Sequence, residues 1–177
     1  MEGSRRERLI LRPLTLDDLH DLALLHAQES FWHYPFRRGW SREETAAFLE
    51  RTVHRYSDPG IAVSAVVVGD TGELAGRAGL SIPTFPREIV PAIEVGWRLV
   101  DRYRGRGYAT EAGSAWVSYG FEQLGLDRIV SIYEPQKAAS GAVMRRLGFT
   151  LERETTHPAR GGPSPCDVAR PDAWLAR

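Results

Sequence analysis

The order of the predicted elements indicates an α/β (α+β) fold, with a mixed, mostly antiparallel central sheet flanked by helices on both faces. Hydrophobic periodicity along the 177 residues gives the order β-α-α-β-β-β-α-β-α-β-β. The consecutive early strands predict hairpins, whereas the later β-α-β step requires a crossover between parallel strands. A chain of this length suits one core, so we expect a single domain over residues 1–177.

The first third of the chain predicts a strand over 9–12 and then two helices. Residues 15–18 and 41–44 read as capping boxes that start these helices. The apolar helix faces contain Leu19, Leu22, Ala23 and His26, and then Phe48, Leu49, Val53 and Tyr56. Between the helices, residues 31–36 and Trp40 are rich in aromatic side chains. This connection covers the core, forms a wall of an acceptor pocket, or does both.

The middle of the chain predicts three strands. Strands over 61–68 and 74–82 flank the turn residues 69–72, which indicates a hairpin. A third strand covers 92–100, and its side chains alternate between two faces. One face is apolar and the other carries the polar residues: Ile93, Val95, Trp97 and Leu99 against Glu94, Gly96 and Arg98.

The last third predicts two helices and three strands. A long helix over 108–124 stops at Gly125, and a shorter one over 138–147 ends in a glycine cap at Gly148. Strands are expected over 128–133, 150–154 and 166–170. Residues 157–165 are rich in glycine and proline and are expected to form a loop, and Pro171 to end the last strand or lie at an edge.

Composition excludes several classes of protein. Lys and Arg total 23 and so do Asp and Glu, so the chain lacks the basic excess of a nucleic-acid-binding protein. Cys166 is the only cysteine, which excludes an intrachain disulfide, and the five histidines show no ligand spacing, so we predict no metal ligands. No apolar run reaches the roughly 20 residues of a membrane helix, and residues 1–6 are polar. We therefore expect no membrane partner and a cytoplasmic location.

Residues 99–110 have the features of a phosphate site. A strand runs into a loop with Gly105 and Gly107, and the loop opens the long helix. The first N–H groups of a helix have no partner within it and carry the positive end of its dipole. Arginines add charge and donors beside this loop: Arg102, Arg104 and Arg106. The segment therefore suits a phosphate or pyrophosphate, although a plain tight turn remains the alternative.

Three motifs in order resemble the GNAT superfamily of N-acetyltransferases over roughly residues 8 to 155. Arg102-x-x-Gly105-x-Gly107 resembles the Arg/Gln-x-x-Gly-x-Gly/Ala motif that holds the pyrophosphate of acetyl-CoA in that family. Glu94-Val95-Gly96-Trp97 precedes it, and Ser140 with Leu147-Gly148-Phe149 follows. The opening Arg8-Leu9-x-Leu11-Arg12 is most similar to the branch that acetylates ribosomal-protein N-termini.

The resemblance implies acetyl-CoA as co-substrate and assigns residues to it. The pyrophosphate would be held by the loop and the start of the helix: Gly105, Arg106, Gly107, Tyr108, Ala109 and Thr110. The backbone at Leu99 and Val100 would pair with the pantetheine arm, as an added strand does. In the family the strand that holds the residue equivalent to Glu94 splays from its neighbour, and the gap admits the thioester.

The resemblance also implies two catalytic residues. Glu94 matches the proposed general base of the ribosomal-protein branch, and an ion pair with Arg98 is the alternative role. Many family members protonate the leaving thiolate with a tyrosine, but Met144 occupies that position, so Ser140 is the candidate donor. Ser140 acting only as a helix cap is the alternative.

Two departures from the family bear on activity. Lys137 stands where the family usually has asparagine, and its side chain either reaches a phosphate of the cofactor or lies in solvent. The proline-rich tail predicts a loose final hairpin.

The predicted function is transfer of acetyl from acetyl-CoA to an amine by direct attack, because no cysteine or Ser-His pair lies near the motifs. The acceptor is a small-molecule amine or a protein N-terminus, and a homodimer stays open. A degenerate module that binds acyl-CoA without turnover is the first alternative. A nucleotide-binding protein of another class is the second.

Overall fold

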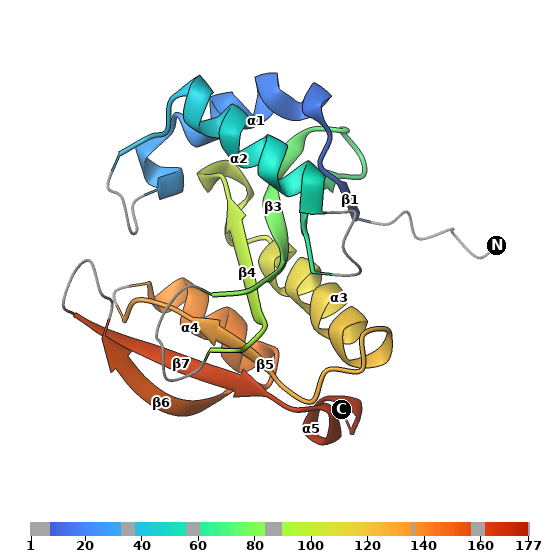
Figure 1. The fold of residues 1–177 in the computed structure, drawn as a ribbon, viewed down its shortest axis with the longest axis vertical. Coiled ribbons are helices and arrows are strands. Elements are labelled where there is room, and N and C mark those ends of the chain that lie inside the picture. The colour runs from blue at the N-terminus through green and yellow to red at the C-terminus, as the bar shows by residue number, and fades with distance from the viewer. Residues whose placement is uncertain are drawn as a thin grey trace. The chain divides into compact units, whose positions relative to one another are not determined.

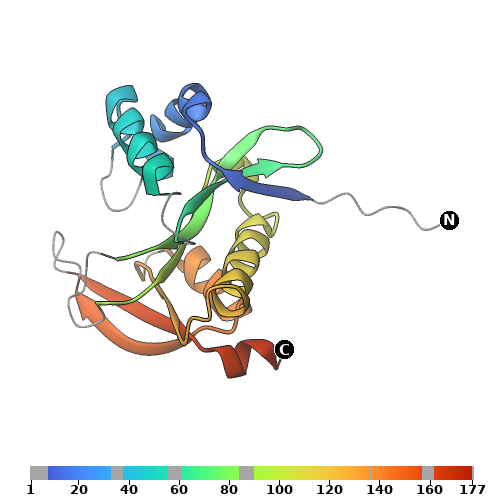
Figure 2. The same ribbon diagram turned by 45° about the vertical axis from the view of Figure 1, so that its right-hand side comes forward.

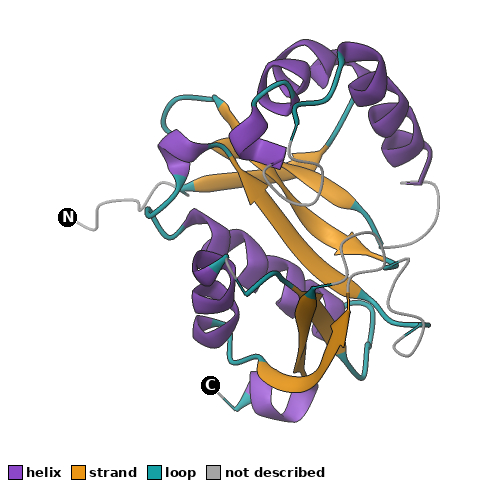
Figure 3. Ribbon diagram, turned by 90° about the vertical axis from the view of Figure 1, so that its left-hand side faces the viewer, coloured by secondary structure: helices purple, strands orange, loops and turns teal. Residues whose placement is uncertain are grey.

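Seven strands form one hydrogen-bonded sheet in the computed structural model, which describes residues 8–32, 38–55, 61–83, 90–135, 137–156 and 162–176. The strands are β1 (Leu9–Pro13), β2 (Val63–Val68), β3 (Leu74–Ser81), β4 (Glu94–Leu99), β5 (Ile129–Ile132), β6 (Thr150–Thr156) and β7 (Pro163–Ala169). Their order is β1-β2-β3-β4-β5-β7-β6. Figure 3 shows the strands in orange and the helices in purple. β4 and β5 are parallel, whereas β1–β2, β5–β7 and β6–β7 are antiparallel. The predicted mixed sheet is confirmed.

Five α-helices accompany these strands in the described chain. They are α1 (Leu19–His26), α2 (Arg42–Arg55), α3 (Tyr108–Glu122), α4 (Ala138–Arg146) and α5 (Pro171–Leu175), with short 3-10 turns at η1 (Leu16–Asp18), η2 (Glu29–Trp32) and η4 (Asp101–Tyr103). The predicted element order is confirmed, but α5 was not predicted. Pro171 starts this helix at a position where its missing N–H costs nothing. None of the described helices is long and apolar enough to span a bilayer.

Contacts divide the chain into two compact units. The first contains residues up to Ala78 together with Trp97–Ala112, and the second contains Gly79–Gly96 together with Gly113–Arg177. β3, β4 and α3 therefore contribute residues to both units. The single-domain organisation over 1–177 stays a prediction.

In the first unit, α1 and α2 lie side by side (Figure 1) and enclose a cluster of rings. His26 of α1 is fully buried, and its ring centroid lies 5.3 Å from that of Phe31, 5.1 Å from that of Trp40 and 5.6 Å from that of Phe48. The prediction that the aromatic connection covers the core is therefore confirmed for Phe31 and Trp40. Residues 33–37 of this connection lie outside the described residues.

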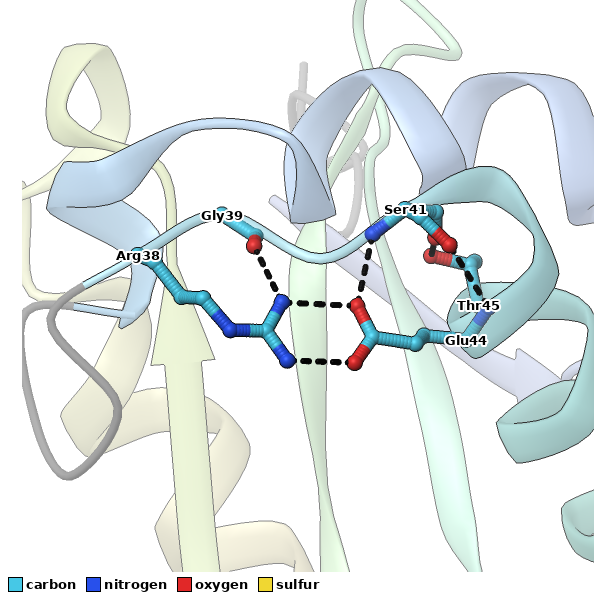
Figure 4. Close-up of polar contacts among 5 residues, drawn as sticks. All are labelled: Arg38, Gly39, Ser41, Glu44 and Thr45. Atoms are coloured by element: carbon cyan, nitrogen blue, oxygen red, sulfur yellow. Dashed lines mark hydrogen bonds and ion pairs between the residues drawn. The ribbon is translucent and has the colours of Figure 1, made fainter.

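A capping box starts α2, as the sequence predicted (Figure 4). The backbone N–H of Ser41 donates to Glu44 Oε2 at 2.8 Å, and the backbone N–H of Glu44 donates to Ser41 Oγ at 3.2 Å. Arg38 adds an N–H from Nη1 to the same Glu44 oxygen at 2.8 Å and another to the Gly39 carbonyl at 2.9 Å. The first predicted box is present too, because Thr15 N–H donates to Asp18 Oδ2 at 2.8 Å.

In the second unit, β6 and β7 form a long antiparallel hairpin (Figure 2). The predicted loop over 157–165 is wrong at its end, because β7 already begins at Pro163, and residues 157–161 lie outside the described chain. Pro165 pairs with Glu154, and its carbonyl accepts a hydrogen bond from Tyr133 N–H at 3.3 Å. A proline therefore fits here because its carbonyl alone joins the ladder to Tyr133. The register shifts between Leu151 and Arg153, which marks a β-bulge.

Candidate active site

The predicted phosphate loop in the first unit joins η4 to α3. Gly105 and Gly107 have φ values of +74° and +82°, a region that residues with a Cβ seldom adopt. A Cβ at Gly105 would meet no atom within 4 Å. The glycines are thus needed for the backbone conformation, and open space lies beside Gly105. The loop leads into the first turn of α3, where the N–H groups of Tyr108, Ala109 and Thr110 precede the first helical hydrogen bond from Glu111 to Gly107 O at 3.0 Å.

The three arginines of this segment differ in their surroundings. The guanidinium groups of Arg102 and Arg106 lie 5.0 Å and 5.7 Å from the ring centroid of Tyr103. Arg102 also pairs with Glu73 at 3.6 Å, and the Tyr103 hydroxyl donates to that carboxylate. Arg104 instead makes an ion pair with Asp101 and donates to the Ser30 carbonyl at 3.0 Å. Arg102 and Arg106 are therefore exposed cations beside the loop. Arg104 is exposed too, but it is hydrogen-bonded to backbone carbonyl groups.

Arg8, which directly precedes β1, contacts the phosphate loop, and the sequence did not predict this contact. Its Nη2 donates to the Arg106 carbonyl, and its Nη1 lies 3.4 Å from the Glu111 carboxylate. Its guanidinium carbon lies 5.0 Å from the Tyr108 ring centroid. These contacts tie the loop to the start of β1. The residues are 98 positions apart, so no local pattern in the sequence could have found the contact.

Three of the backbone groups at Leu99 and Val100, which are predicted to pair with pantetheine, already have protein partners. Val100 N–H donates to the Ala75 carbonyl at 3.0 Å, and Val100 C=O accepts from Tyr103 N–H at 3.0 Å. The Leu99 carbonyl accepts a hydrogen bond from Arg104 Nε at 3.2 Å. This carbonyl has a second lone pair, so the bond from Arg104 does not exclude pairing with an added strand, and the roles of Leu99 and Val100 stay predictions.

Glu94 in the second unit lies beside an apolar strip. The register pairs Glu94 with Val130 on β5, and Val130 with Val168 on β7. Residues that are directly opposite on neighbouring strands point to the same face of the sheet. Val130 and Val168 belong to a buried cluster with Ala92 and Cys166, to which Ile132 adds partly buried surface. The face that is polar along β4 is therefore apolar on β5 and β7.

This environment sets the ionisation of Glu94. Burial raises the pKa of the half-buried Glu94 carboxyl to about 7, and a hydrogen bond from the backbone N–H of Ile132 opposes the shift. A carboxyl group with a pKa near neutrality can take up and release a proton at physiological pH. Arg98, the predicted alternative partner, donates to the Phe31 carbonyl at 2.6 Å and lies over the Phe31 ring.

Cys166 shares the apolar strip but does not suit nucleophilic chemistry. Burial, reinforced by the negative charge of Glu152, raises the pKa of its thiol to about 11. The reactive form of cysteine is the thiolate, which is scarce at neutral pH when the pKa is this high. The Cys166 thiol is therefore poorly suited to act as a nucleophile at neutral pH.

Helix α4 carries the remaining predicted site residues. Lys137 is its N-cap residue, and the Lys137 carbonyl accepts the N–H of Ser140 at 2.9 Å. Ser140 is half-buried at the third helical position, so the interpretation of Ser140 as the N-cap is wrong. Met144 is buried, with 1% of its surface exposed, and its thioether has no proton to donate.

The predicted site residues thus form two groups. The phosphate-loop residues with Leu99 and Val100 belong to the first unit, and Glu94, Lys137 and Ser140 belong to the second. The part played by each residue stays a prediction.

Comparison with known proteins identifies the family. The model of the acetyltransferase (GNAT) domain matches residues 8–150. The N-acetyltransferase p20 of Bacillus licheniformis is 28% identical over 153 residues, which cover 86% of this chain and 84% of p20. Spermidine N(1)-acetyltransferase of Escherichia coli K12 is also 28% identical over 153 residues, covering 83% and 75% of the two chains. The chain therefore belongs to the GNAT family of acetyltransferases.

A solved structure supports the same fold. RimL, a ribosomal L7/L12 alpha-N-protein acetyltransferase in complex with coenzyme A, superposes with a TM-score of 0.78 at 20% identity. The match covers 94% of this chain and 96% of RimL. The predicted enzyme class, an N-acetyltransferase, is confirmed at the level of the family.

Proposed function

We propose that this protein transfers the acetyl group of acetyl-CoA to a primary amine by direct attack in a ternary complex. The observation that carries the proposal is Glu94, a carboxyl group in an apolar strip whose pKa is raised by burial to about 7. An amine arrives mostly as an ammonium ion, and only its free base attacks a thioester. A base with a pKa near the working pH is the most effective acceptor for that proton.

Acetyl-CoA, as co-substrate, supplies an acetyl group in thioester linkage. The ionised Glu94 takes a proton from the ammonium, directly or through a water molecule, so that the nitrogen lone pair attacks the thioester carbonyl carbon. The carbon–sulfur bond then breaks and CoA leaves as a thiolate, which takes up the second proton that the nitrogen releases as the amide forms. Ser140 donates a hydrogen bond to this thiolate in place of the tyrosine that Met144 replaces.

The phosphate loop holds the other end of the co-substrate. Gly105 and Gly107 at positive φ let the backbone approach a pyrophosphate closely, and the first turn of α3 offers N–H groups and a positive dipole end. Arg102 and Arg106 add positive charge beside the loop. Lys137, at the start of α4, is assigned to a phosphate of the same co-substrate.

The acceptor is proposed only as a primary amine. A polyamine acetyltransferase and an N-terminal acetyltransferase both appear among the similar proteins, so small amines and protein N-termini are both candidates. The cytoplasmic location and the homodimer stay predictions.

The test is the variant Glu94→Gln, assayed by release of free CoA with a panel of spermidine, small amino alcohols and peptides with free N-termini. Loss of a general base lowers kcat by about 10²–10⁴-fold. We expect this loss at pH 7 with whichever amine the wild type accepts, while the affinity for CoA is unchanged. Glu154→Gln is the matched control, because Glu154 is an exposed glutamate on β6 in the same unit.

Two outcomes would contradict the proposal. Full activity of Glu94→Gln would remove Glu94 as the base. Binding of CoA by the wild type without turnover of any amine would favour the module that binds acyl-CoA without catalysis.

A further inference from the structure

Next to Glu94, side chains take the place of a backbone hydrogen bond in the ladder between β4 and β5. The strands pair at Glu94 and Val130, where Val130 N–H donates to the Ile93 carbonyl at 2.9 Å. In a continuous parallel ladder, the next bond from β5 would run from Ile132 N–H to the Val95 carbonyl. Here the Ser131 hydroxyl donates to the Val95 carbonyl at 2.9 Å, and Ile132 N–H donates to the Glu94 carboxylate. The Ser131 hydroxyl and the Glu94 carboxylate thus bond the two backbone groups, Val95 C=O and Ile132 N–H, that would pair with each other in a continuous ladder.

We propose that Ser131 is a positioning residue for Glu94: its hydroxyl occupies the Val95 carbonyl, so that the N–H of Ile132 is directed to the Glu94 carboxylate. The significance of this contact for catalysis rests on the proposed role of Glu94 as base. Ser131 is 2% exposed. It alternates with Val130 along β5, so its side chain lies on the face of the sheet opposite to Glu94. Ser131 therefore acts through the backbone and does not touch the reacting atoms.

Among the described residues, the charged groups on the face of Glu94 do not replace this contact. Alternation along the strands places Arg128 before β5, Arg153 on β6 and Cys166 on β7 on that face, with Glu152 in the adjacent bulge. Arg128 and Arg153 lie 3.0 Å and 3.9 Å from the Glu152 carboxylate. Arg98, which follows on β4 itself, donates to the Phe31 carbonyl. The bond from Ile132 is thus the contact that favours ionised Glu94 against burial.

The geometry predicts what removal of the hydroxyl does. In Ser131→Ala the Val95 carbonyl loses its donor, and Ile132 N–H becomes the nearest replacement, as in an ordinary parallel ladder. Glu94 then loses a hydrogen bond that favours its charged form, and its pKa rises further. Hydrogen bonds to charged groups correspond to a shift of about one to two pH units. Activity at pH 7 falls and recovers at higher pH.

The experiment measures the pH dependence of kcat/KM and, separately, the titration of Glu94 by NMR of protein carrying ¹³C-labelled glutamate carboxyl groups. The Glu94→Gln variant identifies the Glu94 resonance. We expect Ser131→Ala to move both midpoints upward by about one to two pH units. Ser131→Thr keeps a hydroxyl and should restore the wild-type midpoints. Ser164→Ala removes another buried serine of the same unit, on β7, and should leave them unchanged.

Different results would overturn the proposed role of Ser131 and the proposed role of Glu94 as base. An unchanged Glu94 midpoint in folded Ser131→Ala overturns the role of Ser131, whatever the activity does. Full activity of Glu94→Gln overturns the proposed base, while the NMR titration still tests the contact of Ser131. If Ser131→Ala does not fold, Ser131→Cys supplies a weaker donor of similar size. A partial upward shift then supports the proposal, and no shift contradicts it.

Discussion

His26 shows how the surroundings of one residue couple its ionisation to folding. The imidazole is fully buried among aromatic rings, and its Nδ1 lies 3.1 Å from Thr45 Oγ1. Burial, followed by the positive charges of Arg77 and Arg98, lowers its pKa to about 3. The sequence predicted that His26 lies on the apolar helix face. It did not reveal the pKa, because Arg77 and Arg98 are brought to this helix by distant strands.

The stability of the protein should therefore fall as pH decreases from about 6.5 towards 3. Over this range the unfolded chain protonates His26 and the folded chain does not, so the unfolded state binds more protons. The contribution of His26 to the free energy of unfolding decreases by up to about 1.4 kcal/mol per pH unit. Urea denaturation of wild type and His26→Gln at pH 7.5, 5.5 and 4.5 measures this contribution as a difference.

Comparison with His26→Gln is needed because Glu94 changes the free energy of unfolding with pH in the opposite direction. Its raised pKa means that the folded chain binds more protons between about 4.5 and 7, so this stabilisation is lost as pH rises through 7. The difference between wild type and His26→Gln cancels that contribution. His20→Asn, at an exposed position of α1, is the control. A stability difference that does not vary with pH would contradict the assignment.

At the scale of one element, the N-terminus of α2 is held by a set of side-chain hydrogen bonds. Ser41 and Glu44 satisfy each other's backbone N–H groups, and Arg38 holds the Glu44 carboxylate from outside the helix. These hydrogen bonds favour ionised Glu44 and lower its pKa to about 2. The cap therefore remains in its charged form at neutral pH.

Replacement of the capping residue gives a prediction for this element. Ser41→Ala removes the oxygen that accepts Glu44 N–H and should lower the free energy of unfolding by about 1 kcal/mol, whereas Ser41→Gly should cost only a few tenths of that value. Chemical denaturation of the two variants measures the difference. An unchanged free energy of unfolding in Ser41→Ala would show that the hydroxyl contributes nothing to the start of α2.

Element order was predictable from the sequence because each long segment carries a clear period, but two features at the C-terminal end were not. Helix α5 spans five residues, too short for a helical period to be read. Pro163 and Pro165 were interpreted as loop residues, whereas both lie within β7. Partners on β6 and at Tyr133 override that local preference.

For the whole molecule, ligand binding should appear as added stability. A ligand at 100 times its dissociation constant that binds only the folded state adds about 2.7 kcal/mol. This corresponds to a rise in Tm of roughly 5–11 °C for a chain of this size. We expect the rise with CoA and acetyl-CoA and not with ATP or NAD, measured by thermal denaturation.

Gly105→Ala should abolish this rise with CoA if the loop holds the pyrophosphate. Gly72→Ala is a matched control, because Gly72 has φ of +71°, similar to the +74° of Gly105, and neither added Cβ meets an atom within 4 Å. Both variants should lose similar stability without ligand, and only Gly105→Ala should lose the response to CoA. An undiminished rise in Tm with CoA in Gly105→Ala would indicate that the loop is a plain turn that does not hold the pyrophosphate.

The candidate site was predictable only where it is encoded locally. The glycines of the loop stand close together in the sequence, and Glu94 follows from strand alternation. Arg8 and Ser131 were missed because each acts through a contact between segments that are distant along the chain. Their roles depend on the register of the assembled sheet.

The bulged strand β6 has a consequence for how copies of this chain meet. β6 lies at one edge of the described sheet, and flat, uncharged edges are templates for strand pairing with another molecule. The bulge between Leu151 and Arg153 interrupts the regular spacing of the edge, and Glu152, Arg153 and Glu154 add charge to it. We therefore expect this edge to resist aggregation, even though Leu151 is exposed there.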